Sequence, residues 1–260
     1  MDQVNKTLYI PLYGKAYVSR RGLILEDKKA EEIWEAEGFK LGGKAKSRWL
    51  AYYMGMRSAV FDRWTEQQLQ ECPDAVVLHA GCGMDSRCVR VDAAGSQWFD
   101  VDFPAVIAER KRYFEETGSY HMIGSDIRDT QWLSEIPAGK TAIIVMEGIS
   151  MYLKPEERKA LLKRWKDRFG EVRILMDTYT LFAARATKYK NPINEVGVTE
   201  VYGLDDPREL EQGTGLTWVQ EHSLTPDWLI AQLPKGEQGI FRKLFAGKMA
   251  RSIYQLHEYQ

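Results

Sequence analysis

Two glycines that follow an apolar run constrain the fold of this chain more than any other feature. Residues 76–78 have the pattern of a strand buried on both faces, and Gly81 and Gly83 then let the backbone turn sharply beside a ligand. A second apolar segment, 98–102, ends on acids about 20 residues later. This arrangement is typical of a doubly wound α/β sheet that holds a nucleoside, with the acid on the ribose hydroxyls.

The turn lacks the third glycine of the dinucleotide-binding pattern G-x-G-x-x-G. Ser86 occupies that place and Arg87 follows it, so the helix after the turn cannot pack as closely under a pyrophosphate. The turn therefore favours a nucleoside without a pyrophosphate, above all S-adenosylmethionine, and conflicts with a nicotinamide-dependent reductase. A plain β-turn without a ligand explains the two glycines alone equally well.

Further motifs surround the glycine turn. Residues 81–90 read G-C-G-M-D-S-R-C-V-R, and the next strand ends as D-V-D-F-P with R-K-R downstream. Two more motifs follow at 124–129 and 147–152. Together these motifs resemble the leucine carboxyl methyltransferase family, over roughly residues 12–179. The family includes protein phosphatase methyltransferases and bacterial small-molecule O-methyltransferases of the tetracenomycin polyketide type, and it implies an S-adenosylmethionine-dependent enzyme.

The resemblance implies which residues bind this cofactor. Arg57 is expected to grip the methionine carboxylate with its planar guanidinium, and Glu147, at the end of a central strand, to lie near the methionine amino group. Asp102 is expected on the ribose and Asp126 on the adenine amino group. The full expected cofactor set comprises Lys15, Arg57, Ala80, Gly81, Gly83, Asp102, Phe103, Asp126, Ile127, Glu147 and Gly148.

Other roles for these side chains stay open at this point. Lys15 can be a solvated lysine. Arg57 can form a surface ion pair with Asp62 or Glu66. Asp126 can cap a helix that follows it, a role compatible with adenine binding.

One tyrosine and several arginines complete the candidate site. Tyr152 is the candidate catalytic residue that orients the methyl acceptor, and it can equally be a core tyrosine. Asp85, Arg87 and Arg90 are expected to brace the turn from behind, because a cation beside a sulfonium is unfavourable. The basic cluster 110–112 is expected on the solvent side of its helix.

The rest of the pattern predicts a seven-stranded, doubly wound Rossmann-like α/β sheet in a single domain. Residues 1–25 are expected to be irregular, because Pro11, Gly14 and Gly22 interrupt them. Helices are expected at 27–37, 46–70, 104–117 and 155–169, and strands at 120–124, 142–146, 172–176, 217–224 and 248–258.

We divide the chain into four segments. These are an N-terminal helical cap (1–74), a cofactor-binding core (75–177), a lid or substrate-wall insertion (178–215) and C-terminal strands and helices (216–260). A helix pair that merely packs is the alternative to the lid.

Composition excludes several classes of partner. The 260 residues include 36 basic and 37 acidic side chains, a net charge of −1 that indicates neither nucleic acid nor an anionic membrane as a partner. No apolar run is long enough to cross a bilayer, and the N-terminus lacks a signal-peptide pattern. Cys72, Cys82 and Cys88 match no zinc or redox spacing, so we expect reduced thiols, a cytoplasmic location and no metal.

These features predict methyl transfer from S-adenosylmethionine to an oxygen of a small molecule, with a carboxylate favoured. A hydroxyl acceptor benefits from a base, and no histidine lies in a motif that faces the ligand. A carboxylic acid, with a reference pKa near 4, needs none. A protein C-terminal leucine carboxyl methyltransferase and an inactive methyltransferase fold that acts as a binding module stay open as alternatives. The sequence leaves the acceptor and the oligomeric state open.

Overall fold

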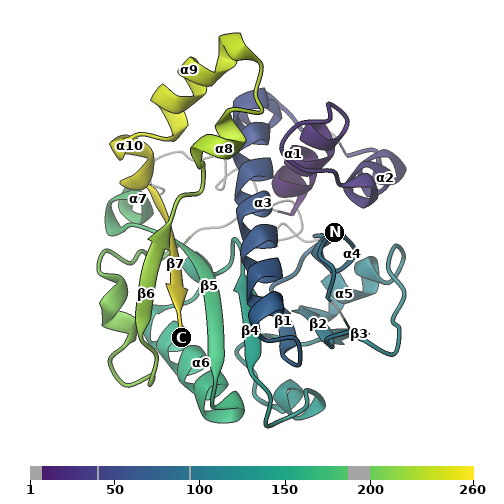
Figure 1. The fold of residues 1–260 in the computed structure, drawn as a ribbon, viewed down its shortest axis with the longest axis vertical. Helices are drawn as coiled ribbons and strands as arrows, with labels where there is room; N and C mark the ends of the chain where they lie inside the picture. Colours follow the sequence, from purple (N-terminus) through teal and green to yellow (C-terminus); the bar gives the residue numbers. More distant parts are fainter. Residues whose placement is uncertain (1–7, 40, 94, 187–199) are drawn as a thin grey trace.

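The computed structural model describes residues 8–39, 41–93, 95–186 and 200–260, and within them seven strands form one sheet in the order β3-β2-β1-β4-β5-β7-β6 (Figure 1). Strands β1 to β5 run parallel, and β7 is antiparallel to both neighbours. The strands are β1 (Val76–Ala80), β2 (Trp98–Asp102), β3 (Tyr120–Gly124), β4 (Ala142–Met146), β5 (Val172–Tyr179), β6 (Trp218–His222) and β7 (Tyr254–Tyr259).

Helices connect the strands and extend beyond them. The α-helices are α1 (Tyr9–Ser19), α2 (Lys28–Glu37), α3 (Arg48–Glu71), α4 (Arg87–Arg90), α5 (Pro104–Arg110), α6 (Pro155–Phe169), α7 (Leu181–Ala186), α8 (Asp227–Ile230), α9 (Lys235–Phe245) and α10 (Lys248–Arg251). Short 3-10 helices are η2 (Gly43–Lys46), η3 (Gln131–Glu135), η4 (Ser150–Tyr152) and η7 (Pro207–Leu210). Among the described residues, no helix is both long and apolar enough to cross a membrane.

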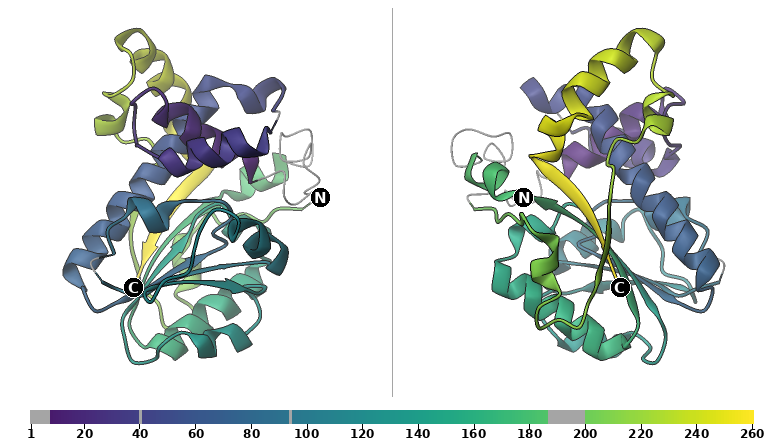
Figure 2. Two further views of the ribbon diagram at one scale, coloured as in Figure 1. Left: turned by 90° about the vertical axis from the view of Figure 1, so that its right-hand side faces the viewer. Right: turned by 60° about the vertical axis from the view of Figure 1, so that its left-hand side comes forward.

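The central strands are buried on both faces, as their continuous apolar runs predict. All residues of β1 and β4 are buried, and successive side chains point to opposite faces. Val77 and Ile143 belong to the core shared with α3, whereas Leu78 and Ile144 belong to the core shared with α6. The helices α3 and α6 therefore cover opposite faces of the sheet, which gives the three-layer arrangement visible in Figure 2.

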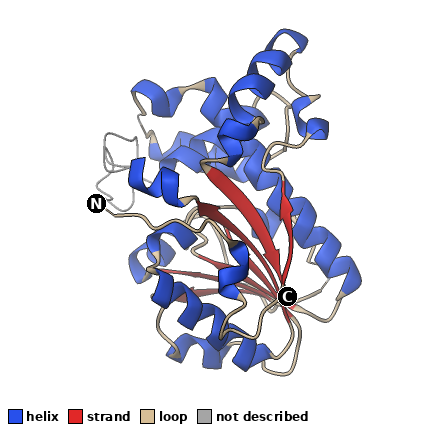
Figure 3. Ribbon diagram, turned by 90° about the vertical axis from the view of Figure 1, so that its left-hand side faces the viewer, coloured by secondary structure: helices blue, strands red, loops and turns tan. Residues whose placement is uncertain are grey.

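The strand order places a ligand crevice at the carboxyl ends of the central strands. β1 lies between β2 and β4, so the chain leaves β1 toward one side of the sheet and later returns on the other. Such a reversal opens a crevice outside the strand ends. The helix α1 and the first half of α3 lie over this edge, as Figure 3 shows from the side.

The expectation of irregular structure over residues 1–25 was wrong, because residues 9–19 form α1. Pro11 lies in the first turn of this helix, where its missing N–H would have no intrahelical acceptor. Gly14 faces α3, and a Cβ at this position would lie 2.6 Å from Cβ of Met54. Both residues look like helix breakers in the sequence, but one fits the helix start and the other allows two helices to pack closely.

Most other elements lie where the sequence predicts them. The helix α2 begins after Asp27, whose side chain accepts from the amide of Ala30, and ends at Gly38 in the left-handed conformation. The helix α5 ends at Arg110, earlier than expected. Residues 248–251 form a helix, so the last strand begins only at Tyr254.

The segment 178–215 starts as a continuation of β5 and then forms α7 and η7. Tyr202 donates its amide to the carbonyl of Met151 at 2.7 Å, which fastens the returning chain beside η4. The centre of the expected lid, 187–199, lies outside the described residues, so the lid stays a prediction.

Candidate active site

A cavity of about 240 Å³ lies at the carboxyl ends of β1, β4 and β5, beneath α1 and α3. Its walls combine charged groups, tyrosines and apolar side chains. They comprise Leu8, Ile10, Pro11, Leu12, Lys15, Leu50, Met54, Arg57, His79, Gly81, Cys82, Gly83, Met84, Asp85, Glu147, Gly148, Ile149, Met151, Tyr152, Tyr179 and Tyr254. Seven residues of the expected site, Lys15, Arg57, Gly81, Gly83, Glu147, Gly148 and Tyr152, therefore share one cavity.

The glycine turn is built as the sequence predicts. Gly81 and Gly83 have φ of +69° and +53°, a region that L side chains rarely adopt. A Cβ at Gly81 would also lie 2.4 Å from the Ile149 side chain. The amide of Gly83 donates to Oδ2 of Asp102 at 2.8 Å, so the acid at the end of β2 fixes the turn directly. Burial raises the pKa of Asp102, and the bond from Gly83 partly offsets this.

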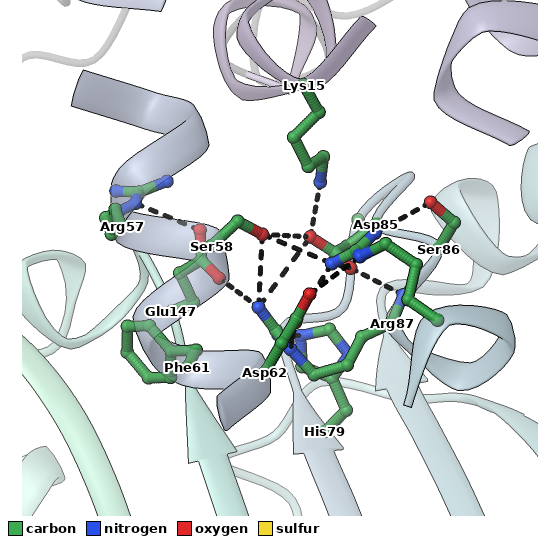
Figure 4. A network of polar contacts seen from close by, with 12 residues as sticks. Lys15, Arg57, Ser58, Phe61, Asp62, His79, Asp85, Ser86, Arg87 and Glu147 are labelled. Carbon is green, nitrogen blue, oxygen red and sulfur yellow. Dashed lines mark hydrogen bonds and ion pairs between the residues drawn. The ribbon is translucent and has the colours of Figure 1, made fainter. Parts of the chain in front are cut away.

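A buried arginine holds several carboxylates behind the turn (Figure 4). Arg87 is fully buried, and its Nε donates to Asp62 at 2.6 Å while Nη2 donates to Glu147 at 2.5 Å. Arg90 donates to Asp62 at 2.8 Å and to Asp27 at 2.6 Å. Both arginines brace the turn as expected, and they do so by linking it to α3, β4 and the start of α2.

Asp85 connects the glycine turn to the helix α1. It pairs with Lys15 from α1, and its other oxygen accepts from Arg90 at 3.1 Å and from the amide of Arg87 at 2.7 Å (Figure 4). Burial alone would raise the pKa of Asp85, but Arg90 and Lys15 outweigh burial and hold this pKa well below its usual range. Lys15 is buried rather than solvated, so that alternative was wrong.

Arg57 lies between two acids that end neighbouring strands. Its Nε donates to Glu147 at 2.9 Å, and its Nη1 lies 3.5 Å from Oδ2 of Asp177. Burial tends to raise the pKa of Glu147, but Arg57 and Arg87 lower it overall, so Glu147 is ionised. Burial raises the pKa of Asp177 to about 6, with only partial compensation from Arg57.

The alternative role left open for Arg57, a surface ion pair with Asp62 or Glu66, was wrong. Arg57 is buried and faces the strand ends, whereas Asp62 accepts from Arg87 and Arg90 on another side of α3.

Three tyrosines line the cavity beside Arg57. Tyr254, the first residue of β7, donates to Asp177 at 2.6 Å and accepts from Nη1 of Arg57 at 3.0 Å. Tyr179 is its register partner on β5, and their ring centroids are 5.0 Å apart. Burial raises the pKa of Tyr152 to about 12 and also raises the pKa values of the other two.

The residues expected around adenosine do not line this cavity. Asp102 lies at the adjoining end of β2, and Phe103 beside it is 44% exposed. Asp126 follows β3 in an exposed loop and pairs with Arg128 at 2.6 Å. Asp126 also accepts from the amide of Arg128, as a local cap does. The remaining two, Ala80 and Ile127, lie outside the cavity wall, at the end of β1 and next to Asp126.

Arg110 does not lie on the solvent side of its helix, so that expectation was wrong. This side chain is fully buried, pairs with Asp100 and donates to the carbonyls of Gly83 and Asp85 at 3.0 and 2.6 Å. An aspartate in the middle of a buried strand requires a partner, and Asp100 in the apolar segment 98–102 was the signal for one. Asp177 was missed as a site residue in the same way. It follows an apolar run, as Glu147 does, and an acid in that position indicates the ligand edge of the sheet.

No free nucleophile or base was found at the turn among the described residues. Burial raises the pKa of the Cys82 thiol well above its usual range, so Cys82 is a packing residue. His79 does reach the cavity, contrary to our placement of it away from the ligand. However, Nε2 accepts from Arg87 at 3.2 Å, which puts the ring proton on Nδ1, 3.4 Å from Asp100, and leaves no free lone pair. No cluster able to hold a metal was found among the described residues.

Comparison with known proteins gives a consistent result. The family model for leucine carboxyl methyltransferase matches residues 5–166. The chain is 30% identical to the tetracenomycin polyketide synthesis O-methyltransferase TcmP of Streptomyces glaucescens, over 97% of this chain and 93% of that protein. It is also 30% identical to the S-adenosyl-L-methionine-dependent methyltransferase dpfgK of Gibberella zeae, over 79% of this chain and 77% of that protein.

The fold is similar to that of a solved methyltransferase. Magnesium protoporphyrin IX methyltransferase of Synechocystis, solved with S-adenosylhomocysteine bound, aligns with a TM-score of 0.54 at 11% identity. The alignment covers 88% of this chain and 92% of that chain. At this identity the likeness concerns the fold, and it agrees with the expected Rossmann-like sheet.

Proposed function

Because this chain belongs to the leucine carboxyl methyltransferase family and is an S-adenosylmethionine-dependent methyltransferase, we propose that it methylates a carboxylate of a small molecule, forming a methyl ester. The relative that takes part in tetracenomycin polyketide synthesis supports a polyketide-like acceptor. The cavity of about 240 Å³ beneath α1 and α3 supports a small acceptor, because helices already cover it.

The charges around the cavity suit the methionine half of the cofactor. In this proposal Glu147 faces the ammonium group, and Arg57 and Lys15 face the carboxylate. The side chain of each of these three groups is buried in an ion pair with a protein partner, so each can exchange that partner for a ligand group. Asp102 then binds the ribose hydroxyls and Asp126 the adenine amino group, with Phe103 and Ile127 as apolar neighbours.

The chemistry requires alignment more than acid–base catalysis. When bound, S-adenosylmethionine supplies a methyl group that is open to in-line displacement. The acceptor carboxylate is ionised at neutral pH and needs no base. The protein then has to hold the carboxylate oxygen in line and exclude water. Tyr152 on the cavity wall is the proposed residue that orients the acceptor.

The observation that carries the carboxylate assignment is that the candidate bases at the cavity are already engaged. Nε2 of His79 accepts from Arg87, and Asp177 accepts from Tyr254 and from the amide of Gly148 at 2.8 Å. A phenol or alcohol acceptor would have to lose its proton to such a group. A carboxylate acceptor avoids this step.

The test is chemical. After a screen of acceptors, the product is labelled from methyl-tritiated S-adenosylmethionine and treated with mild alkali. An ester releases volatile labelled methanol, which is the expected result. A product that keeps its label is an ether and would contradict ester formation, while leaving the methyltransferase activity intact.

A further inference from the structure

Part of the cavity wall lies beyond the segment that the family model matches. That match ends at residue 166, whereas Tyr179 and Tyr254, which line the cavity, come from the later strands β5 and β7. Both residues therefore lie outside the part of the chain that the family model matches.

The antiparallel pairing of β5 with β7 fixes the geometry of the two tyrosines. Tyr179 and Tyr254 are register partners, so their side chains stand on the same face of the sheet. The hydroxyl of Tyr254 is held between Asp177 and Arg57. Tyr152, from η4, lines the cavity with them and interacts electrostatically with Tyr179.

Two of the three hydroxyls are free to bind a ligand. Within the described parts of the chain, the hydroxyls of Tyr152 and Tyr179 have no hydrogen-bond partner, although both residues line the cavity. Neither hydroxyl oxygen is fully buried, so both retain access to the cavity. A hydroxyl in such a position is satisfied by water or by a ligand atom.

The cations near these tyrosines, Arg57 and Lys15, face the cofactor carboxylate in the proposed function and so are not left for the acceptor. Arg57 faces Glu147 and Asp177, and Lys15 faces Asp85. The cavity therefore offers neutral donors to an acceptor. The tyrosines stay protonated at neutral pH because burial raises their pKa values. Tyr152 and Tyr179 can therefore each donate a hydrogen bond to an acceptor oxygen, whereas the hydroxyl of Tyr254 already donates to Asp177.

We infer that the hydroxyls of Tyr152 and Tyr179 form a carboxylate-binding subsite that positions the methyl acceptor, with Tyr254 holding Asp177 and Arg57 beside it. One acceptor oxygen receives the phenolic hydrogen bonds, and the other stays free to attack the methyl group. The apolar body of the acceptor then lies against Leu50, Met54 and Met151, which line the same cavity. This inference rests on the proposed ester formation and names the residues that recognise its substrate class.

The test uses benzoate as the probe and benzamide as its uncharged analogue. Each is titrated calorimetrically into the full chain saturated with S-adenosylhomocysteine. We expect benzoate to bind more tightly than benzamide, and Tyr179→Phe to weaken benzoate binding about tenfold, the size of one lost hydrogen bond to a charged group. Because Tyr179→Phe removes only an oxygen with no described partner, affinity for S-adenosylhomocysteine should stay unchanged.

Two further variants separate recognition from general packing. Tyr53→Phe is the matched control, because Tyr53 packs against Tyr254 with ring centroids 6.4 Å apart but does not line the cavity, and it should leave benzoate affinity unchanged. Tyr254→Phe should instead change S-adenosylhomocysteine binding through Arg57, because the hydroxyl of Tyr254 is engaged by Asp177 and Arg57 rather than by the acceptor.

Unchanged benzoate affinity in Tyr179→Phe would overturn the inference, as would equal affinities for benzoate and benzamide or no benzoate binding at millimolar concentration. The failure of the proposed function would look different, because the alkali treatment would then leave the label on an ether. An ester product combined with unchanged benzoate affinity would reject the subsite alone.

Discussion

The two halves of the ligand edge are built in different ways. At the ends of β1, β4 and β5, the side chains of Arg57, Asp85, Arg87 and Glu147 are buried and hold one another across four elements. At the ends of β2 and β3, the acids hold nearby backbone instead. Asp102 accepts from the amide of Gly83, and the partly exposed Asp126 after β3 pairs with Arg128 within its own loop.

This difference indicates how each half contributes to folding and to binding. In the first half, the groups proposed for the methionine moiety also hold α1 and α3 to the sheet, so a substitution there affects stability and affinity together. In the second half, Asp126 pairs within its own loop, so a substitution there should remove the proposed ligand contact with little effect on the fold. The predictions below test this contrast.

The largest effect is expected for Arg87→Met. This change removes a fully buried charge and leaves Asp62 and Glu147 without their strongest donor. Breaking a buried ion pair from one side typically costs about 3–5 kcal/mol of unfolding free energy. Urea denaturation measures it, and Lys163→Met, which removes an exposed pair with Asp167, is the matched control. Equal midpoints for both variants would contradict the structural role of the buried network.

The next effect concerns affinity. Glu147→Gln keeps the shape of the side chain but removes the charge proposed to face the cofactor ammonium, and Arg57→Ala removes the group proposed for the carboxylate. Each variant should lose about 1.5–3 kcal/mol of S-adenosylmethionine binding, or tenfold and more. Calorimetry well below the melting temperature separates this loss from the lower stability expected of both variants. Normal binding in both would show that the cofactor assignments are wrong.

The sequence predicts the parts of this molecule that local pattern determines. The buried strands, the glycine turn and the helix after Asp27 all follow from a few neighbouring residues. The helix α1 was missed because Pro11 and Gly14 resemble helix breakers. Pro11 fits the first turn of the helix, and Gly14 is explained only by its close contact with Met54 on α3. Local pattern cannot supply a contact between helices that are distant in the chain.

The pairing of buried charges is harder to predict for the same reason. Charge at Arg110 suggests a solvent-facing side chain, and only the position of Asp100 on the neighbouring strand explains why it is buried. The cavity shows this most clearly, since Tyr254 is far from Asp177 in the chain and the β5–β7 pairing brings them to 2.6 Å. The motifs near the turn identify the type of site. The tyrosines proposed to bind the acceptor come together only in the tertiary structure.

The smallest effect is expected at the other half of the edge, for Asp126→Asn. The side chain of Asp126 is partly exposed and pairs with Arg128 in the same loop, an interaction that contributes little to stability in water. The unfolding curve should therefore stay unchanged. Affinity for S-adenosylmethionine should fall only about two- to tenfold, the range of a single hydrogen bond to the adenine amino group.

Asp129→Asn is the control for this prediction, because Asp129 lies in the same loop and caps the amide of Thr130 at 2.8 Å without a proposed ligand contact. Calorimetry on both variants should show a loss only for Asp126. If Asp126→Asn instead lowered stability as Arg87→Met does, the two halves would be built alike and the contrast would fail. If its affinity matched that of Asp129→Asn, adenine would be bound elsewhere, and Ile127 with its backbone amide would be the next group to examine.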